Sequence, residues 1–498
     1  MNNRGIVYLV FLGMCSTGSF AEDKNKINFH EVKQNVQRLF VPKSNDDYQK
    51  VQLSELSNFE YHSEQITQLP LISFTAEHQK QVFKTAAKIT NMSINEAVQM
   101  AVKRHPTISQ GVSSLSAQNA NIDFAKSGYY LQLSAGLTTG DLTSRQYGRQ
   151  LFEVSARQLL YDFGKTKTNV DLEKTRLLAY QANFLVGVDD IAAQVANSVV
   201  NVRRYEELIR IAKEQIKGIA RILEIASLRA NAGISSQADP IQAETYLQAA
   251  EANLIVQQTQ LNLYQQKLST LLGMDVKNIK FDVSESLIRS SDIYDDPQYN
   301  KIPHMMLAKV QSDLAHLEKK QTQLTAYPTL SVRGSVSQAI NGQHPDTGKS
   351  NDTDANMMLE VSSNFYQGGA IAAKTRSASY AEQAAKARLD EIYLQTQDNI
   401  RFAQEQIENK QKQMNVLFIQ QAATAKTKEL YQEQYKLNTR TLVDLLNAEQ
   451  SIHSAHQQIE SIRYDIYTHI IDYISSAGKS RDVYQLNHLV IQGIEIQP

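Results

Sequence analysis

The sequence predicts a mainly α-helical fold with a smaller β portion, in which one long structural pattern occurs twice. Three observations predict it. Residues 130–273 resemble residues 327–478, each copy opens with stretches of alternating apolar and polar residues, and long helical stretches poor in proline follow. A repeat unit of this length indicates a duplicated substructure rather than a solenoid of short repeats.

The two copies align at nearly constant spacing. Leu160–Gly164 matches Phe365–Gly369 at an offset of 205, and the same offset places Asp239 on Asp444. Upstream of these blocks the offset is only 197, so the second copy is eight residues longer within residues 327–366. Two halves that differ mainly in one loop suggest pseudo-symmetry in the folded chain.

The N-terminus reads as a secretory signal. Arg4 supplies the positive charge, Ile6–Met14 the apolar core and Ser19–Ala21 a small-x-small cleavage site. Cys15, the only cysteine, falls inside this segment, so the mature chain would lack a thiol for a disulfide, a zinc site or a nucleophile. The formal net charge of -1 gives no basic footprint for nucleic acid.

The expected division of the chain follows from the signal and the repeats. It is residues 1–21 as signal peptide, 22–91 as an N-terminal extension of unknown role, 92–290 as first repeat, 291–478 as second repeat and 479–498 as C-terminal tail. Each repeat should begin with helix: Ser93 and Glu96 fit a capping box, and Pro106 divides the first run into two helices.

A change of period then predicts strands. Apolar residues alternate with polar ones over residues 131–138 and 152–157, and again over residues 330–337 and 359–365. Period two is the mark of a strand with one apolar and one polar face. Strands of roughly ten residues are long enough to cross a bilayer when tilted.

Long helices follow each pair of strands. No proline occurs from Lys165 to Ala232, and neither proline nor glycine from Ala370 to Asn438. Apolar residues recur in steps of three and four, as in helices that pack against helices. Breaks at residues 231–239 and 437–441 should return the chain as antiparallel helices.

Four strands cannot close a barrel, and an open sheet edge in lipid leaves backbone groups unsatisfied at several kcal/mol each. Three copies would supply twelve strands, within the range of outer-membrane barrels. The apolar faces would meet lipid, and the polar faces would line a wet lumen. The candidate lumen residues are Glu153, Arg157, Arg333 and Glu360.

These features together resemble the TolC-like outer-membrane efflux and secretion channels, over residues 92–478. Tyr435–Ala448 is similar to the second inter-helix turn of that family, residues 232–239 to the first, and Leu160–Gly164 to the strand-to-helix exit. The resemblance implies a homotrimer in the outer membrane of a Gram-negative cell, with a twelve-stranded β-barrel and a periplasmic α-barrel tunnel. It also implies a periplasmic adaptor and an inner-membrane partner.

The resemblance further implies a gate at the periplasmic end. Tyr435 and Arg440 would link to Asp239 on the neighbouring helical hairpin, and Asp444 would belong to an acidic ring. Asn447 stands where the family pattern has a second ring carboxylate, which weakens the expected affinity for cations.

Ordinary helix capping explains some of the same residues. Asp239 precedes Pro240 and could be an N-cap, and Thr441 with Asp444 could be a capping pair. Asn438 takes the place of a turn glycine, and asparagine tolerates the positive φ that such a turn needs.

Other chemistry is poorly supported. His453, His456 and His469 share one helix without a carboxylate or cysteine constellation, so solvent-facing or trimer-packed histidines are favoured over a metal site. We expect no enzyme activity and no cofactor. The leading hypothesis is the passive exit duct of type I protein secretion, with an ABC transporter and an adaptor. The alternatives are a multidrug or metal efflux duct with a proton-driven pump, and a periplasmic coiled-coil protein that forms no pore.

Overall fold

The structure is a computed structural model. It describes residues 59–61, 90–140, 149–283, 286–364, 366–491 and 494–496. The signal segment with Cys15, most of the extension 22–91, the connection 141–148 and Phe365 lie outside the described residues. The described residues all belong to one compact unit, Gln52–Pro498.

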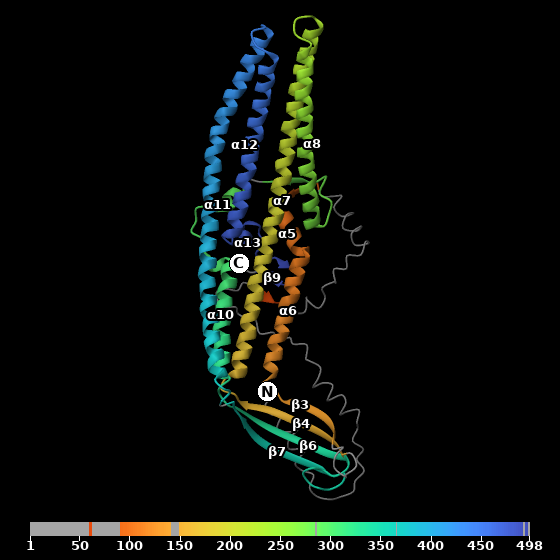
Figure 1. Cartoon of the computed structure of the whole chain (residues 1–498), viewed down its shortest axis with the longest axis vertical. Helices are drawn as coiled ribbons and strands as arrows, with labels where there is room; N and C mark the ends of the chain where they lie inside the picture. Colours follow the sequence, from red (N-terminus) through yellow and green to blue (C-terminus); the bar gives the residue numbers. More distant parts are fainter. Residues whose placement is uncertain are drawn as a thin grey trace. The chain divides into compact units, whose positions relative to one another are not determined.

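The helices and strands carry the labels of Figure 1. The helices are α5 (Ile94–Arg104), α6 (Pro106–Ser127), α7 (Lys165–Asn231), α8 (Ala238–Leu272), α9 (Ser286–Ser290), η1 (Tyr299–Lys301), α10 (Pro303–Leu324), α11 (Ala370–Lys436), α12 (Leu442–Ser476) and α13 (Ser480–Val483). The strands are β1 (Phe59–Tyr61), β2 (Asn91–Ser93), β3 (Gln132–Gly140), β4 (Arg149–Tyr161), β5 (Lys280–Asp282), β6 (Thr329–Asn341), β7 (Thr353–Ser362), β8 (Val490–Ile491) and β9 (Ile494–Ile496).

The predicted duplication is present in the helices. The long helices α7 and α11 each have 67 residues, and the return helices α8 and α12 each have 35. Both connecting turns use one left-handed residue, Gly233 at φ 72 and Asn438 at φ 58. Asparagine therefore replaces glycine in the way predicted, because its short polar side chain tolerates this conformation.

Local signals at the start of the first repeat are also confirmed. The Ser93 hydroxyl accepts from the Glu96 backbone N–H, and a Glu96 carboxylate oxygen accepts from the Ser93 N–H at 2.8 Å. These two bonds satisfy donors that the first helical turn leaves free. His105 then has an extended conformation, and Pro106 begins α6. The predicted break between two helices is therefore correct.

The four long strands form one antiparallel sheet in the order β3-β4-β6-β7. Figure 1 shows this sheet at one end of the helices, with both helical turns at the other end. Two smaller sheets lie elsewhere: β2 pairs with β5, and β1 pairs with β9 of the C-terminal tail. In the second of these, Phe59–Tyr61 from the N-terminal extension aligns with Ile494–Ile496.

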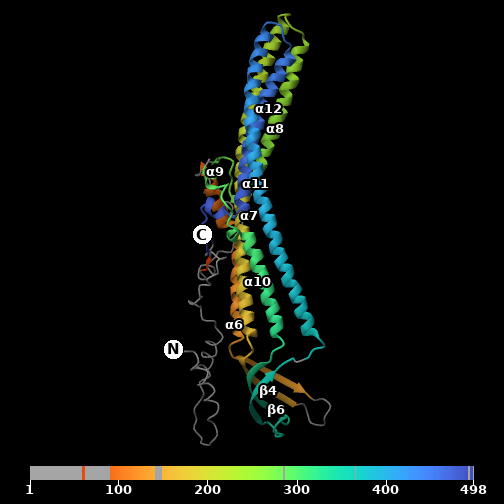
Figure 2. The same ribbon diagram turned by 90° about the vertical axis from the view of Figure 1, so that its left-hand side faces the viewer.

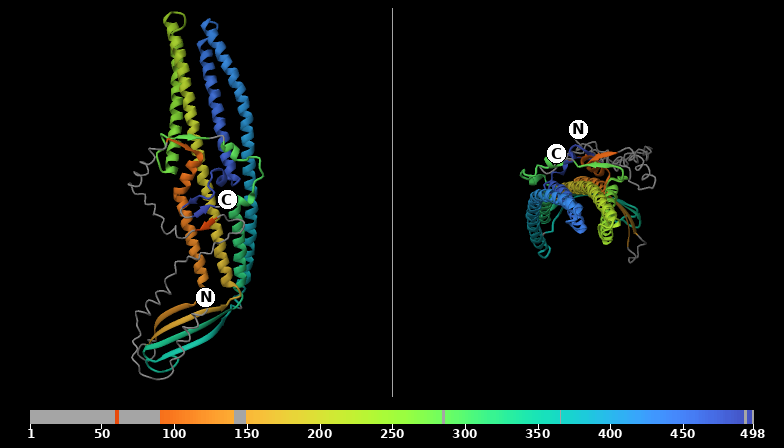
Figure 3. Two further views of the ribbon diagram at one scale, coloured as in Figure 1. Left: turned by 180° about the vertical axis from the view of Figure 1, so that it is seen from behind. Right: turned by 90° about the horizontal axis from the view of Figure 1, so that it is seen from above.

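The helical layer has two central and two outer long helices. α7 packs against α6, α8, α10 and α12, while α11 packs against α10 and α12. Figures 1 and 3 show the two hairpins, α7 with α8 and α11 with α12, side by side. Among the described helices, none is long and apolar enough to cross a membrane.

Candidate functional site

The four charged residues predicted to line a lumen lie on one face of the sheet. Arg157 of β4 is directly opposite Arg333 of β6, and strand alternation puts Glu153 on the same face as Arg157. Glu360 of β7 is opposite Ser331, two residues from Arg333. The register therefore brings together residues that are far apart in sequence.

These residues neutralise one another in crossed pairs. The Arg157 Nη2 atom is 3.3 Å from Glu360 Oε2, and Arg333 Nη2 is 3.7 Å from Glu153 Oε1. Arg157 Nε also donates to Ser331 Oγ at 3.3 Å. Two arginines directly opposite in a sheet repel each other, so the paired glutamates offset an unfavourable contact.

The opposite face of the sheet is apolar and exposed. Leu133 and Leu137 of β3, and Met357, Leu359 and Val361 of β7, have large exposed fractions. Within the described residues, β3 and β7 each pair with one strand only, which leaves two free sheet edges. A sheet with one exposed apolar face and two free edges is incomplete as a soluble structure.

At the helical tips, the partners of Arg440 within this chain do not include Asp239. Arg440 Nη1 lies 3.7 Å from Asp444 Oδ2, and Arg440 Nε donates to Gln434 Oε1 at 3.0 Å. Its guanidinium also sits 4.6 Å from the centre of the Tyr431 ring. All these partners belong to α11 or α12, so Arg440 stabilises its own turn.

Tyr435 does not bond to Asp239 either. Its ring is buried between the hairpins, and its hydroxyl has no hydrogen-bond partner among the described residues. Burial raises the pKa of Tyr435; Arg229 opposes the shift and Asp239 adds to it. Tyr435 therefore lies in the field of Asp239 without a hydrogen bond to it.

Arg229 is the tip residue that sequence analysis missed. Its guanidinium lies 4.8 Å from the centre of the Tyr435 ring, and Nη2 donates to Asn438 Oδ1. Arg229 lies in the last turn of α7, whereas both partners belong to the second hairpin, so these contacts join the two hairpins. No local pattern announces this pairing, because it spans 209 residues of sequence.

The remaining gate candidates are Asp444, Asp239 and Asn447; one caps a helix and another bonds to the other hairpin. Thr441 and Asp444 form a capping box, so the capping interpretation of that pair is correct. The hydrogen bond from the Thr441 hydroxyl lowers the pKa of Asp444. Asp239 is not an N-cap, because α8 already begins at Ala238 with Gln237 as its cap. Asn447 accepts from the Tyr246 hydroxyl at 2.9 Å, a second bond between the hairpins.

One predicted histidine environment is corrected. His453 is neither solvent-facing nor a ligand; it is buried, with Nε2 at 3.1 Å from Glu449 Oε1. Lys428 Nζ lies 2.6 Å from the other oxygen of Glu449. Burial acts to raise the pKa of Glu449, but the bonds from His453 and Lys428 outweigh it and hold the pKa below its usual value. No cluster that could hold a metal occurs in the described part of the chain.

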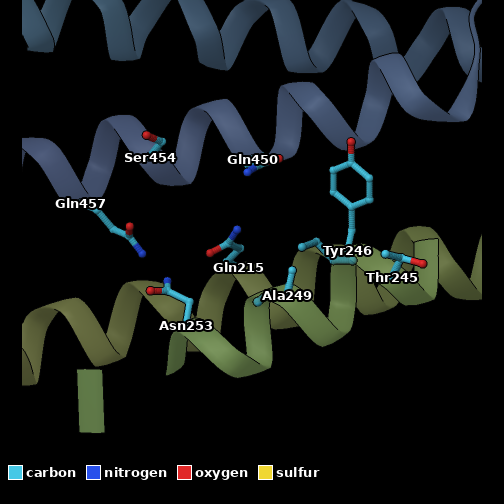
Figure 4. A pocket seen from close by; sticks show the side chains of 10 residues that line it. Gln215, Thr245, Tyr246, Ala249, Asn253, Gln450, Ser454 and Gln457 are labelled. Atoms are coloured by element: carbon cyan, nitrogen blue, oxygen red, sulfur yellow. The ribbon is translucent and has the colours of Figure 1, made fainter. Parts of the chain in front are cut away.

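A groove of about 450 Å³ lies between the hairpins near the tips (Figure 4). Uncharged polar residues line it, with Gln215 from α7, Asn253 from α8 and Gln457 from α12 pointing toward one another. Other lining residues include Ala249, Ala250 and the hydroxyl residues Thr245, Tyr246 and Ser454. A groove lined by uncharged amide and hydroxyl groups suits packing against another polar surface.

Comparisons with known proteins agree with this architecture. The family model described as "Outer membrane efflux protein" matches residues 97–274. Outer membrane protein TolC of Escherichia coli K12 is 21% identical in an alignment of 439 residues that covers 82% of this chain and 86% of that protein. Alkaline protease secretion protein AprF of Pseudomonas aeruginosa is 19% identical over 342 residues, covering 66% of this chain and 70% of that protein.

A solved structure matches the fold. The outer membrane protein VceC of Vibrio cholerae gives a TM-score of 0.66 at 16% sequence identity, over 77% of this chain and 96% of that one. The predicted fold class, long duplicated helical hairpins with a β portion, is confirmed.

Proposed function

The chain belongs to the TolC-like family of outer-membrane efflux proteins, and we propose that it is the trimeric exit duct of a type I protein secretion system. Like its relatives it resides in the outer membrane, with the long helices in the periplasm. The helical tips then lie farthest from the membrane, and the four-stranded sheet lies within it.

The sheet carries the proposal of a trimer. Within the described residues, the sheet of one protomer has an exposed apolar face that suits lipid and two free edges whose backbone groups would lack hydrogen-bond partners there. Pairing of β7 in one copy with β3 in the next would satisfy the edge groups and continue the register. Three copies give twelve strands with the apolar face toward lipid.

In such a barrel the polar face surrounds the lumen. Glu153, Arg157, Arg333 and Glu360 from each copy would then line a ring of fixed charges of both signs. A wall of paired charges is wet and carries little net field, which suits the passage of a polypeptide with mixed charges.

We infer a passive role, with energy supplied from the inner membrane. The described residues show no catalytic arrangement, and the groove between the hairpins is uncharged. An ABC transporter and a periplasmic adaptor would supply energy and cargo. Support for protein cargo comes from AprF, whose name makes it a protease secretion protein.

Efflux of small molecules with a proton-driven pump is the second candidate. It is favoured by the description of the matching family as efflux proteins. The third alternative, a periplasmic protein that forms no pore, does not fit a chain that belongs to an outer-membrane channel family.

The tips would close the periplasmic end. Arg229 with Tyr435 and Asn438, and Tyr246 with Asn447, hold the two hairpins of one copy together. Each exposed polar link is worth only about 1 kcal/mol or less. A partner that binds an open arrangement better could therefore shift the equilibrium toward it.

A deletion strain tests the choice of cargo. We expect it to lose specific proteins from the culture supernatant, measured by mass spectrometry, while its sensitivity to drugs and metals stays at the wild-type level. Complementation with the intact gene serves as the control. Normal supernatants with raised drug sensitivity would replace secretion by efflux.

A paired substitution tests the orientation of the sheet. Leu359→Lys places a charge on the apolar face at a cost of up to about 2–4 kcal/mol per copy near the bilayer centre, so heat-resistant trimers should disappear from outer-membrane fractions. The neighbouring change Glu360→Gln, on the polar face, should leave trimers intact. Equal loss of trimers in both variants would argue against lipid and lumen faces as assigned.

A further inference from the structure

The connection between β6 and β7, residues 342–352, is a folded loop. It lies within the region where the second repeat carries its eight extra residues. Figures 1 and 2 place it at the end of the sheet remote from the helices. In the membrane this is the outer end of the proposed barrel.

The loop is held by its own hydrogen bonds. The His344 N–H donates to the Lys349 carbonyl at 2.8 Å, and the Gly348 N–H donates to the His344 carbonyl at 2.9 Å. Gln343 and Ser350 form an isolated antiparallel bridge at its base. These bonds make a small hairpin of defined shape.

One buried contact fixes the loop against the sheet. His344 Nε2 is 2.9 Å from Ser337 Oγ, and both residues are almost fully buried although the surrounding sheet is exposed. Ala339, two residues farther along β6, is buried as well. Something must cover these positions, and the loop does.

The covered face is the polar one. Ser337 lies directly opposite Glu153 in the β4–β6 pair, and strand alternation puts it on the same side as Arg333. The loop therefore folds over the face that carries the candidate lumen charges. It does not fold outward over the apolar face.

The hydrogen bonds also assign the proton on His344. The Asp346 N–H donates to Nδ1 at 3.2 Å, so Nδ1 must be the acceptor. The ring proton is then on Nε2, which donates to Ser337 Oγ. A neutral imidazole thus bridges loop and strand.

We propose that residues 342–352 form a fixed constriction at the outer mouth of the channel, which selects what leaves it. This inference rests on the proposed function, because it needs the polar face to surround the lumen. Three copies of the loop would then point toward one axis. Asp346, whose side chain is 64% exposed, and the exposed Lys349 would be the charges that a passing solute meets.

Release of the loop is the first test. His344→Ala removes the bridge to Ser337, and single-channel conductance in planar lipid bilayers should rise above that of the wild type. The conservative variant His344→Gln keeps a donor toward Ser337 and should stay closer to the wild type. Ser335→Ala is the matched control, since Ser335 is on the same strand face but bonds to Asn356 of β7.

A charge change tests the same loop without disturbing its fold. Asp346→Lys in all three copies should shift the reversal potential in a salt gradient toward that of the anion. Asp296→Lys, an exposed acidic residue far from the sheet, should cause no shift.

The outcomes separate the two ideas. A wild-type protein that gives no channel in lipid removes both the proposed function and this inference. A wild-type channel whose conductance and reversal potential are the same in His344→Ala and Asp346→Lys removes the constriction alone. A raised conductance together with a shifted reversal potential supports it.

Discussion

The two long helices α7 and α11 have the same length and equivalent places in the repeats, yet one is central and the other is at an edge. At the offset of 205, Ile211 of α7 corresponds to Val416 of α11; their exposed fractions are 1% and 65%. Asp189 corresponds to Leu394, and here the exposed fractions are 4% and 58%. The second pair reverses ordinary expectation, since the carboxylate is buried and the leucine exposed.

The comparison teaches that duplication sets helix length but not burial. α7 is covered by α5, α6, α10 and α12, while α11 has fewer neighbours within the chain. Its exposed apolar side chains include Phe402, Val416 and Ile419. In the proposed trimer this surface faces the next copy, so the edge helix would complete its packing only on assembly.

The largest effect is expected at Asp189. Burial raises its pKa from 3.8 to about 7, with Arg481 opposing the shift. The folded protein thus keeps a proton that the unfolded chain releases. This stability is fully present below the ordinary pKa and is lost as pH rises toward 7, by up to about 4 kcal/mol.

The variant Asp189→Asn should flatten this dependence. Thermal unfolding in detergent, followed at several pH values from 4 to 7, should show a smaller fall in Tm than the wild type. The control is Asp190→Asn at the neighbouring exposed residue; it removes only the smallest cause of the raised pKa of Asp189 and should keep most of the wild-type slope. Parallel slopes for Asp189→Asn and the wild type would show that Asp189 titrates normally.

Glu449 shows the next difference in burial between the two repeats. It is buried in α12, whereas its equivalent Glu244 in α8 is exposed. Lys428→Met would leave the Glu449 carboxylate facing only His453, at a cost of about 3 kcal/mol, since removal of one partner leaves a buried charge uncompensated. Unfolding by a chemical denaturant should show this decrease in the free energy of unfolding.

The exposed residue Lys426, two positions away, provides the control. Lys426→Met should change the free energy of unfolding by no more than about 0.5 kcal/mol. If Lys428→Met is as stable as Lys426→Met, the buried pair is not a source of stability.

Substitutions at Ile211 and Val416 test directly whether α7 is buried within one copy and α11 only on assembly. Ile211→Ala removes buried methyl groups and should cost the protomer about 2–3 kcal/mol. Val416→Ala should leave protomer stability unchanged but lower the fraction of trimer at dilute protein concentration, measured by light scattering. A protomer that loses equal stability with either change would mean that α11 is buried within one copy.

Sequence patterns predict the long helices and the four long strands, because the signals for these elements are local. Period-two alternation found the four strands, and the capping pair Ser93 with Glu96 marked a helix start. Asn438 was correctly assigned to a left-handed turn, because turn chemistry depends on one residue. The lumen candidates fell on one face because strand alternation fixes the face of every residue.

The burial of single helix residues and their side-chain partners depend on contacts between residues that are distant in sequence. Nothing local distinguishes the buried Asp189 from an exposed helix carboxylate, because its burial comes from α13 and other segments packed around α7. The contacts at the tips show the same dependence: within one chain Arg440 bonds in its own turn, and Arg229 makes the link between the two hairpins. The length of a helix and the sheet face of a strand residue are thus encoded locally, whereas the distant partner of a side chain is not.

The smallest expected effect compares the two turns. Arg229 and Gln434 are equivalent at the offset of 205, and their backbone carbonyls close the two turns in the same way, at 2.9 Å from Ile234 N and 3.0 Å from Thr439 N. The two residues differ only in which hairpin their side chains contact. Arg229 contacts the other hairpin through Asn438, whereas Gln434 accepts from Arg440 in its own turn.

Arg229→Ala should therefore loosen the contact between hairpins by about 1 kcal/mol, too little to unfold the protein but enough to populate an open tip. Single-channel conductance in lipid bilayers should rise. Gln434→Ala removes a bond of similar strength within one turn and should leave conductance at the wild-type value. Because the two variants disturb equivalent positions, a rise in both would mean that any loosened turn opens the tip. A rise in neither would mean that closure does not depend on contacts between the hairpins of one copy.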